Sequence, residues 1–341
     1  MKNFLIKCSI FLIYILVLYT IFPIIVDPFN VFHVKNIRSN GVEPNKNYIK
    51  MKYILDNPKK FNSFIFGSSR VGALNVKKIN IGNFYNMTYS AGTPPEHLAN
   101  LKTFLKNNIS PEKIYIGVDS FSYLEDFHDH FSQQLRCPYE KITNDKFNFM
   151  RLYLNPSVAF GSFHIMFEDE ESELYVKNFY ETGSNVKYGA VSKFKWDSDE
   201  VKPSLGESFG KKGYINLKLA LNSIQEIKNL CDKNNIELII FTNPMHQITY
   251  RASIETQYFD FLKGLADITE FYNFSSLNNI TLDNNNYLET SHYKAEVGDL
   301  MIDVMFNNKK YPELYKQGFG VKINKNNIDE FIKFLKSQLE K

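Results

Sequence analysis

Two segments far apart in the chain carry side chains that together are able to perform nucleophilic catalysis. Ser69 lies in a Gly-Ser-Ser-Arg turn directly after an apolar run, and His292 follows Glu289 by three residues in a polar loop near the C-terminus. A nucleophilic serine needs a base, and a carboxylate can hold the imidazole of that base in one tautomer. These residue types therefore predict acyl transfer, with Ser69 as nucleophile, His292 as base and Glu289 as the residue that orients His292.

The elements that must position these residues follow the pattern of a parallel α/β sheet, because short apolar runs alternate with helical stretches. We expect strands at Ser63–Phe66, Asn83–Met87, Lys113–Val118, Ile236–Thr242 and Ile268–Tyr272. We expect helices near Tyr48–Leu55, Glu96–Lys106, Leu217–Asn234 and Lys294–Phe306. Ser69 then lies at the end of a strand, where α/β folds present a nucleophile. A capping serine on an ordinary polar turn is the alternative.

The N-terminus predicts a membrane anchor. No charged residue occurs from Cys8 to Val26, which is close to the roughly 20 apolar residues that cross a bilayer as a helix. Lys2 and Lys7 precede this run and Asp27 follows it, a bias that favours a cytoplasmic N-terminus. A cleaved signal peptide is the alternative, but no small-residue cleavage site follows the run. We expect a single-pass anchor with an extracytoplasmic domain.

The connection between the third and fourth strands is longer than an α/β crossover needs, which indicates a cap over the strand ends. Its acidic run at 168–173 is expected to be a solvated face. The expected organisation is a cytoplasmic tip and anchor at 1–27, a stalk at 28–60, an α/β domain at 61–119 and 214–310, a cap at 120–213, and a C-terminal helical extension at 311–341.

Composition excludes several classes of protein. The 341 residues are 44% hydrophobic and 15% aromatic with a net charge of +3, so neither disorder nor a nucleic-acid footprint is indicated. Three cysteines form no disulfide framework and no zinc-binding spacing. Cys137 and Cys231 either pair with each other or are two buried thiols. No cofactor is implied.

The order of these motifs resembles the SGNH/GDSL hydrolase superfamily over roughly residues 60–310, and in particular its membrane-anchored members. Relatives of that kind are the alginate-acetylation and teichoic-acid D-alanylation proteins of cell-envelope polysaccharide acylation. The first block is matched by Gly67-Ser68-Ser69, and the last by Glu289-Thr290-Ser291-His292. The resemblance implies a flavodoxin-like three-layer sandwich and a serine esterase or O-acyltransferase. Its substrate would be a glycan or other acyl ester, with a membrane acyltransferase as a possible partner.

The two middle blocks of the family supply an oxyanion hole. The resemblance places the second on Gly92 and the third, usually Gly-x-Asn, on Gly117-Val118-Asp119. An ionised carboxylate accepts hydrogen bonds and cannot donate them, so Asp119 either donates to the oxyanion in a protonated form or has a structural role. Backbone N–H groups of Ser69 and Gly92 remain as donors, with Asn243 as a further candidate. A catalytically weak accessory protein that binds glycan or a membrane acyltransferase is therefore the alternative function.

The remaining candidates each have a plainer alternative. Arg70 lines the substrate site or forms an internal salt bridge, and His246 points into the cleft or packs in the core. A dense acidic and imidazole cluster binds a metal or is a solvated loop, the second being preferred, and it comprises Asp126, His128, Asp129 and His130.

Overall fold

The computed structural model describes residues 1–37, 42–154, 173–199 and 201–340, which form two compact units. Unit 1 contains Met1–Tyr53 and His130–Lys177, and unit 2 contains Ile54–Asp129 and Asn178–Lys341. The acidic run expected at 168–173 lies, apart from the backbone of Glu173, outside the described residues. Residues 120–213, expected to form one cap, are divided between the two units.

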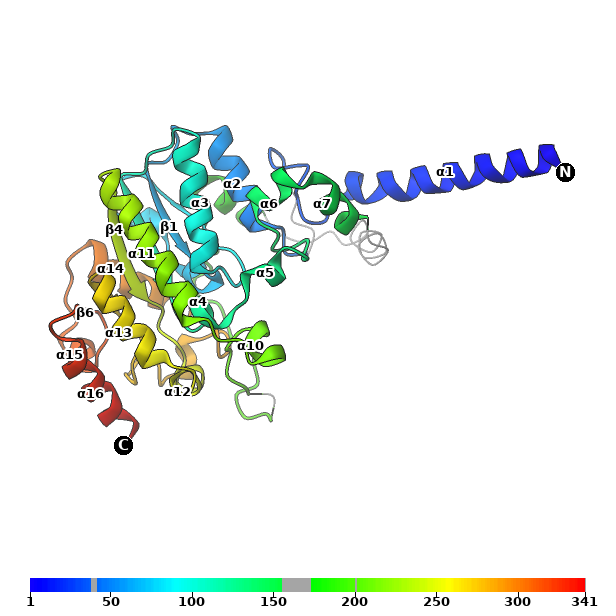
Figure 1. Cartoon of the computed structure of the whole chain (residues 1–341). Coiled ribbons are helices and arrows are strands. Elements are labelled where there is room, and N and C mark those ends of the chain that lie inside the picture. The colour runs from blue at the N-terminus through cyan, green and yellow to red at the C-terminus, as the bar shows by residue number, and fades with distance from the viewer. Residues whose placement is uncertain (38–41, 155–172, 200, 341) are drawn as a thin grey trace. The chain divides into compact units, whose positions relative to one another are not determined.

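Unit 2 is built on a six-stranded sheet with the order β2-β1-β3-β4-β5-β6 (Figure 1). The strands are β1 (Ser63–Gly67), β2 (Phe84–Asn86), β3 (Lys113–Val118), β4 (Glu237–Thr242), β5 (Phe271–Asn273) and β6 (Val321–Ile323). All neighbours are parallel except β5 and β6, which are antiparallel. The predicted α/β class with a mostly parallel sheet is confirmed.

Helices cover both faces of this sheet, because residues of one strand alternate between them. Phe64 and Phe66 of β1 stack near Phe104 of α3, whereas Ile65 joins a cluster with Met301 of α14 on the other face. The larger helices are α3 (Pro94–Lys106), α11 (Leu217–Lys233), α13 (Tyr258–Ile268), α14 (Ala295–Phe306) and α16 (Ile328–Leu339). Shorter ones are η1 (Ser69–Ala73), η2 (Val76–Lys78), α4 (Phe121–Leu124), α5 (Phe127–His130), α10 (Glu207–Lys212), α12 (Gln247–Ile254), η3 (Asn284–Asn286) and α15 (Pro312–Lys316).

The C-terminal third of the sheet differs from expectation. Ile268 ends α13, so the strand predicted at Ile268–Tyr272 begins three residues later than expected. Residues 311–341, expected as a helical extension, contain β6 between two helices. The three residues of β6 are too few to display a strand period, and only their pairing with β5 identifies them.

Unit 1 contains one helix, α1 (Lys2–Val26), that is long and apolar enough to cross a membrane by length and composition. Its most apolar window has a mean hydropathy of 2.6 and is only 11% buried, unlike a core helix. The other helices that lie in or reach into this unit are α2 (Lys46–Asp56), α6 (Tyr139–Asn144), α7 (Lys146–Tyr153) and α9 (Glu173–Glu181).

The stalk expected at residues 28–60 is not extended. At the end of α1 the buried carboxylate of Asp27 accepts the backbone N–H groups of Val31, Phe32 and His33 at 2.8–2.9 Å, which folds the chain back at once. Val31 then packs with Phe149 in a small apolar core. Polar composition suggested a linker, but many apolar side chains in this segment are buried, among them Val31, Val34 and Ile49, although Phe32 is exposed.

Close packing under the sheet edge makes Gly117 a sensitive position. A Cβ on Gly117 would lie 2.3 Å from Cγ1 of Val71 and 2.9 Å from the ring of Phe241. We expect Gly117→Ala to lower the free energy of unfolding by about 1–3 kcal/mol, because overpacking displaces both neighbours. Gly210→Ala is the control, since among the described residues nothing lies within 4 Å of its Cβ. Denaturant unfolding checks this, and equal effects of the two changes would contradict it.

Candidate active site

The site lies where β1 and β3 end side by side. These strands are neighbours in register, with Gly67 opposite Gly117, although β2 lies between them in sequence. From β1 the sheet grows in one direction through β2 and in the other through β3. Ligands of open α/β sheets bind at such a switch point, outside the carboxyl ends of the strands. Ser69 follows β1 and Asp119 follows β3, so both are placed at this edge.

Ser69, His292 and Glu289 form a continuous line of hydrogen bonds. The Oγ of Ser69 lies 2.8 Å from Nε2 of His292, and Nδ1 of His292 is hydrogen-bonded to Oε1 of Glu289. An ionised carboxylate only accepts hydrogen bonds, so Nδ1 carries the ring proton. The lone pair on Nε2 then faces the serine hydroxyl. The expected proximity of Ser69 and His292 is confirmed, across 223 residues of sequence.

Glu289 is held in its ionised form by the loop that contains it. Burial acts to raise the pKa of Glu289, but the hydrogen bond and charge of His292 and the backbone N–H groups of Ser291 and His292 outweigh burial, and the pKa is lowered. Those N–H groups lie 2.6 and 3.0 Å from the carboxylate oxygens. The carboxylate is thus fixed by its own loop and is able to stabilise an imidazolium when His292 accepts a proton.

The two backbone N–H groups expected as oxyanion donors are not paired within the described part of the protein. Within the described residues, the N–H groups of Ser69 and Gly92 donate to no protein acceptor. Gly92 backs onto the end of β1, since a Cβ there would lie 2.8 Å from the carbonyl oxygen of Gly67. Only glycine permits this close approach. The motif glycine therefore lies beside the turn that carries Ser69.

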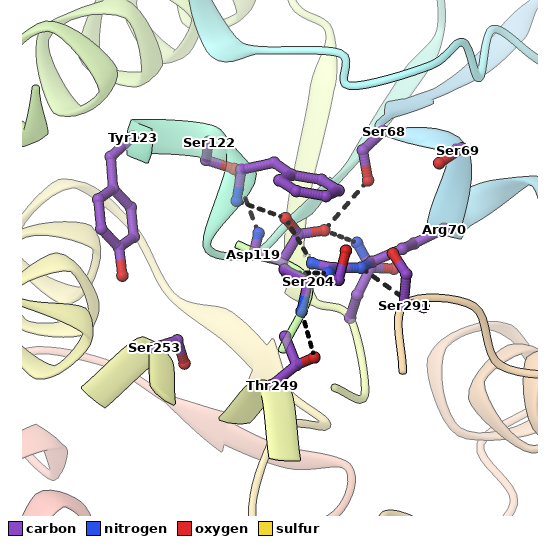
Figure 2. Close-up of polar contacts among 12 residues, drawn as sticks. Ser68, Ser69, Arg70, Asp119, Ser122, Tyr123, Ser204, Thr249, Ser253 and Ser291 are labelled. Atoms are coloured by element: carbon purple, nitrogen blue, oxygen red, sulfur yellow. Dashed lines mark hydrogen bonds and ion pairs between the residues drawn. The ribbon is translucent and has the colours of Figure 1, made fainter. Parts of the chain in front are cut away.

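Asp119 is buried and cannot serve as an oxyanion donor. Its carboxylate accepts the hydroxyl of Ser68 at 3.1 Å, the N–H of Phe121 at 2.9 Å and the amide of Asn243 at 2.9 Å. It also forms an ion pair with Arg70 at 2.9 Å (Figure 2). The side-chain amide of Asn243, expected as a candidate oxyanion donor, instead donates a hydrogen bond to Asp119.

Arg70 does not line the substrate site. Its side chain has an exposed fraction of 0% and lies over the ring of Phe121, 4.3 Å from the centroid. Besides the ion pair with Asp119, it donates to the carbonyl oxygens of Ser291 at 3.1 Å and Ser204 at 3.0 Å (Figure 2). Of the two alternatives for Arg70, the internal salt bridge is the one observed.

His246 is also a packed residue rather than a substrate-lining one. Its ring stacks on Trp196 with centroids 4.8 Å apart, its Nε2 lies 2.9 Å from Asn284, and its Nδ1 accepts the N–H of Ile248. Burial lowers the pKa of His246, so the ring is neutral. A neutral ring satisfies both contacts, because Nε2 donates while Nδ1 caps α12.

Three residues that were not predicted from the sequence contact Arg70 or the loop from Leu288 to His292. We call these residues, Ser192, Lys202 and Ser204, the strap, and this loop the catalytic loop. Ser192 donates to the carbonyl oxygen of Leu288 at 2.5 Å, and Thr290 donates to the carbonyl oxygen of Lys202 at 2.7 Å. With the bond from Arg70 to Ser204, these contacts secure the loop that carries His292. All three are hydrogen bonds to backbone carbonyls, which leave no residue-type signal in a sequence.

The acidic and imidazole cluster forms no metal centre. In the described part of the chain, no group of three or more His, Cys, Asp or Glu side chains is arranged to hold a metal ion. Asp126 contacts His128 at 3.1 Å, and Asp129 pairs with Lys212 at 2.5 Å. The solvated-loop interpretation fits His128, whose side chain is 64% exposed, but not His130, which is buried. All three cysteines, Cys8 included, are free, so no disulfide joins Cys137 and Cys231.

Comparison with known proteins adds no family to this geometry: no family model matches the chain, and no curated protein matches it.

The lowered pKa of Glu289 leads to a pH-dependent contribution to stability. A carboxyl group whose pKa is lower in the folded state stabilises the fold above its unfolded pKa, and this contribution is lost as the pH falls through the folded pKa. We expect Glu289→Gln to lower the free energy of unfolding by about 1 kcal/mol at neutral pH, since the group is partly exposed. The difference from wild type should shrink in acid.

Denaturant unfolding at neutral and acidic pH measures this effect, with Glu340→Gln as the control at an exposed position. A difference between wild type and Glu289→Gln that is the same at both pH values would contradict the linkage.

Proposed function

We propose that this chain is a membrane-anchored, extracytoplasmic serine esterase or O-acyltransferase of the SGNH type that acts on an acylated cell-envelope or exported polysaccharide. The single observation that carries the proposal is the hydrogen-bonded line from Ser69 through His292 to Glu289. Nucleophile, base and orienting carboxylate have the mutual geometry that acyl transfer requires.

In the first half-reaction, Oγ of Ser69 attacks the carbonyl carbon of the acyl ester while its proton passes to Nε2 of His292. Glu289 stabilises the resulting imidazolium through Nδ1. Negative charge develops on the carbonyl oxygen, and the N–H groups of Ser69 and Gly92 are the donors for it. The imidazolium returns its proton to the leaving alkoxide, which departs as an alcohol and leaves an acyl group on Ser69.

In the second half-reaction, His292 removes a proton from the acceptor, whose oxygen forms a bond to the acyl carbon. The bond between this carbon and Oγ of Ser69 breaks, the proton passes from His292 to Oγ, and the acyl group leaves as a carboxylic acid or a new ester. Water as acceptor gives an esterase, and a sugar hydroxyl gives an O-acyltransferase. The difference depends on whether water is excluded from the acceptor site.

Two further features support the proposal. The parallel strands follow the order β2-β1-β3-β4-β5, which is the strand order of flavodoxin-like sheets. The resemblance to the SGNH/GDSL superfamily implies a fold of this kind. The apolar helix α1 would keep the enzyme at the membrane, near exported glycan. In this proposal, the segment that contains Ser192, Lys202 and Ser204 borders the substrate site, because Ser192 and Lys202 contact the loop that carries His292 and Ser204 contacts Arg70.

A catalytically weak accessory protein is the second candidate, and one observation favours it. Asp119 stands where the family has a side-chain amide donor, and its carboxylate is an acceptor paired with Arg70. Loss of one such donor typically costs on the order of 10²–10³ in rate. The accessory protein would bind glycan or a membrane acyltransferase instead of transforming the ester.

Covalent labelling separates the two candidates. We expect the full-length protein in detergent to react with a fluorophosphonate at Ser69, and Ser69→Ala to remain unlabelled. His292→Ala should slow labelling by at least about 10²-fold, because general-base assistance is worth roughly that much. Intact-protein and peptide mass spectrometry locate the adduct.

Ser68→Ala is the control for this experiment, because the Ser68 hydroxyl donates to Asp119 rather than to His292. This variant should still carry its label on Ser69. Absence of any label on the wild-type protein would favour the accessory function. Hydrolysis of an acetylated sugar ester by untreated wild-type protein would support the enzyme.

The anchor is tested separately. Arginine at both Leu12 and Ile15 should release the protein from membranes during alkaline extraction, because each charge near the bilayer centre costs about 2.5–3.5 kcal/mol. Leu12→Ala with Ile15→Ala is the control, which should stay membrane-bound. Protease added outside intact cells should digest unit 2. Protection of unit 2 until the membrane is opened would contradict the extracytoplasmic location.

A further inference from the structure

Arg70 joins the two catalytic segments directly. It is the residue after Ser69, and its Nε donates to the carbonyl oxygen of Ser291, the residue before His292, at 3.1 Å. A second hydrogen bond therefore joins the two segments beside the bond between Ser69 and His292, and each of its partners is one residue away from a partner of that bond. Two segments separated by more than 220 residues of sequence are thereby held together by one side chain in addition to the reacting groups.

A longer route connects the same two segments through the core. The guanidinium of Arg70 pairs with one oxygen of Asp119, and the other oxygen accepts the amide of Asn243 at 2.9 Å. The carbonyl of Asn243 accepts the hydroxyl of Tyr293 at 3.1 Å, and Tyr293 is the residue after His292. The contacts form a closed ring, because Ser69 is bonded to Arg70 and His292 to Tyr293 through the main chain.

The charges and proton positions in this ring are mutually consistent. Burial, and then the negative charge of Asp119, raises the pKa of Tyr293 well above its usual value, so the phenol keeps its proton and donates to Asn243. The amide of Asn243 must then direct its N–H toward Asp119, as observed. Arg70 and Asp119 have exposed side-chain fractions of 0% and 2%, so solvent does not screen their attraction.

We propose that Arg70 is a positioning residue, held by Asp119, that sets the separation of Ser69 Oγ and His292 Nε2. The proposal rests on the proposed function, in which this separation governs proton transfer. In a network of this kind a misplacement of about 1 Å costs roughly 10²-fold in rate. Asp119 thus acts through Arg70 instead of contacting the oxyanion.

Arg70 variants separate the charge from the hydrogen-bonding fork. Arg70→Lys keeps a cation beside Asp119 but lacks the planar fork that reaches Ser291 and Ser204 at the same time. Arg70→Met removes both charge and fork and leaves Asp119 buried and unpaired. Arg70→Met with Asp119→Asn removes both charges, so no unpaired ion remains in the core.

We measure two quantities on each full-length variant in detergent, the melting temperature and the rate constant of fluorophosphonate labelling. In the labelling step, a bond forms between Ser69 Oγ and phosphorus, fluoride leaves, and the serine proton passes to His292. We expect Arg70→Met alone to melt at a lower temperature and the double variant to recover much of that loss. All three variants should label at least about tenfold more slowly than wild type.

Divergence of stability and rate identifies a positioning role. Tyr85→Phe is the matched control, because it deletes a buried hydrogen bond to the carbonyl oxygen of Phe179 elsewhere in unit 2. It should lower the melting temperature and leave the labelling rate unchanged. A double variant that labels within about twofold of wild type would overturn the proposal, since the tie to Ser291 would then have no effect on the reaction.

A second measurement does not depend on serine reactivity, and it distinguishes failure of this proposal from failure of the proposed function. Ser69→Cys places a thiol beside His292, and an adjacent imidazolium lowers a thiol pKa. In this background, the rate at which iodoacetamide alkylates the thiol at position 69 is measured as a function of pH by peptide mass spectrometry. We expect substantial alkylation below pH 7. Adding Arg70→Met with Asp119→Asn should abolish this alkylation below pH 7.

The two readouts have separate meanings. A wild-type protein without a fluorophosphonate label contradicts the enzymatic function. Even then, loss of alkylation below pH 7 in the triple variant supports the positioning role. An alkylation profile that is identical with and without the Arg70 and Asp119 changes would contradict the positioning role, whatever the labelling result.

Discussion

The buried ion pair between Arg70 and Asp119 is the interaction on which the candidate active site depends. Arg70 follows β1 and Asp119 follows β3, so the pair joins two neighbouring parallel strands at the point where the strand order switches. Two charges removed from water in this way are strongly coupled, because either one alone would be a costly unpaired ion. The pair is therefore retained or replaced as a unit, and the loop carrying His292 is attached to it through Ser291.

The site combines fixed and accessible parts. The residues Arg70, Asp119, Asn243 and Tyr293 are buried, whereas His292 has an exposed side-chain fraction of 39% and Glu289 of 33%. A reacting base must meet a substrate, so it cannot be covered, but its geometry can be fixed by neighbours that are. The loop from Glu289 to His292 achieves this, since its carboxylate is held by its own N–H groups and its backbone by the strap. Preorganised groups of this kind need little rearrangement during reaction.

The N-terminal helix is positioned by a different interaction. The helix α1 is apolar on all sides and largely exposed within the chain, so its partner in the proposed function is lipid. The chain turns immediately after it because Asp27 accepts three consecutive backbone N–H groups, and the hydroxyl of Tyr153 also contacts this carboxylate. A buried carboxylate with this many donors makes the end of the helix a folded junction rather than a flexible linker.

The sequence by itself determined the features that depend on local pattern. Hydrophobic period and turn residues located the first four strands and the helices α2, α3, α11 and α14, and apolar length identified α1. The helices α12 and α13 were not predicted. Ser69, Glu289 and His292 were selected from residue type and order, and the structure brings all three together. The role of Asp119 could be predicted only in part. The sequence shows that an ionised carboxylate cannot donate a hydrogen bond, but it does not show that Arg70 pairs with this carboxylate.

Only the tertiary structure decided the features that depend on non-local contacts. β6 is a strand because β5 lies beside it, and His246 is a core residue because Trp196 covers one face of its ring. The segment after Asp27 folds compactly because Phe149, more than a hundred residues later, packs against Val31. Hydrogen bonds to backbone carbonyls, such as those that secure the catalytic loop, carry no residue-specific signal. Local sequence fixes propensity and chemistry, whereas the partner of a buried polar group is chosen by the fold as a whole.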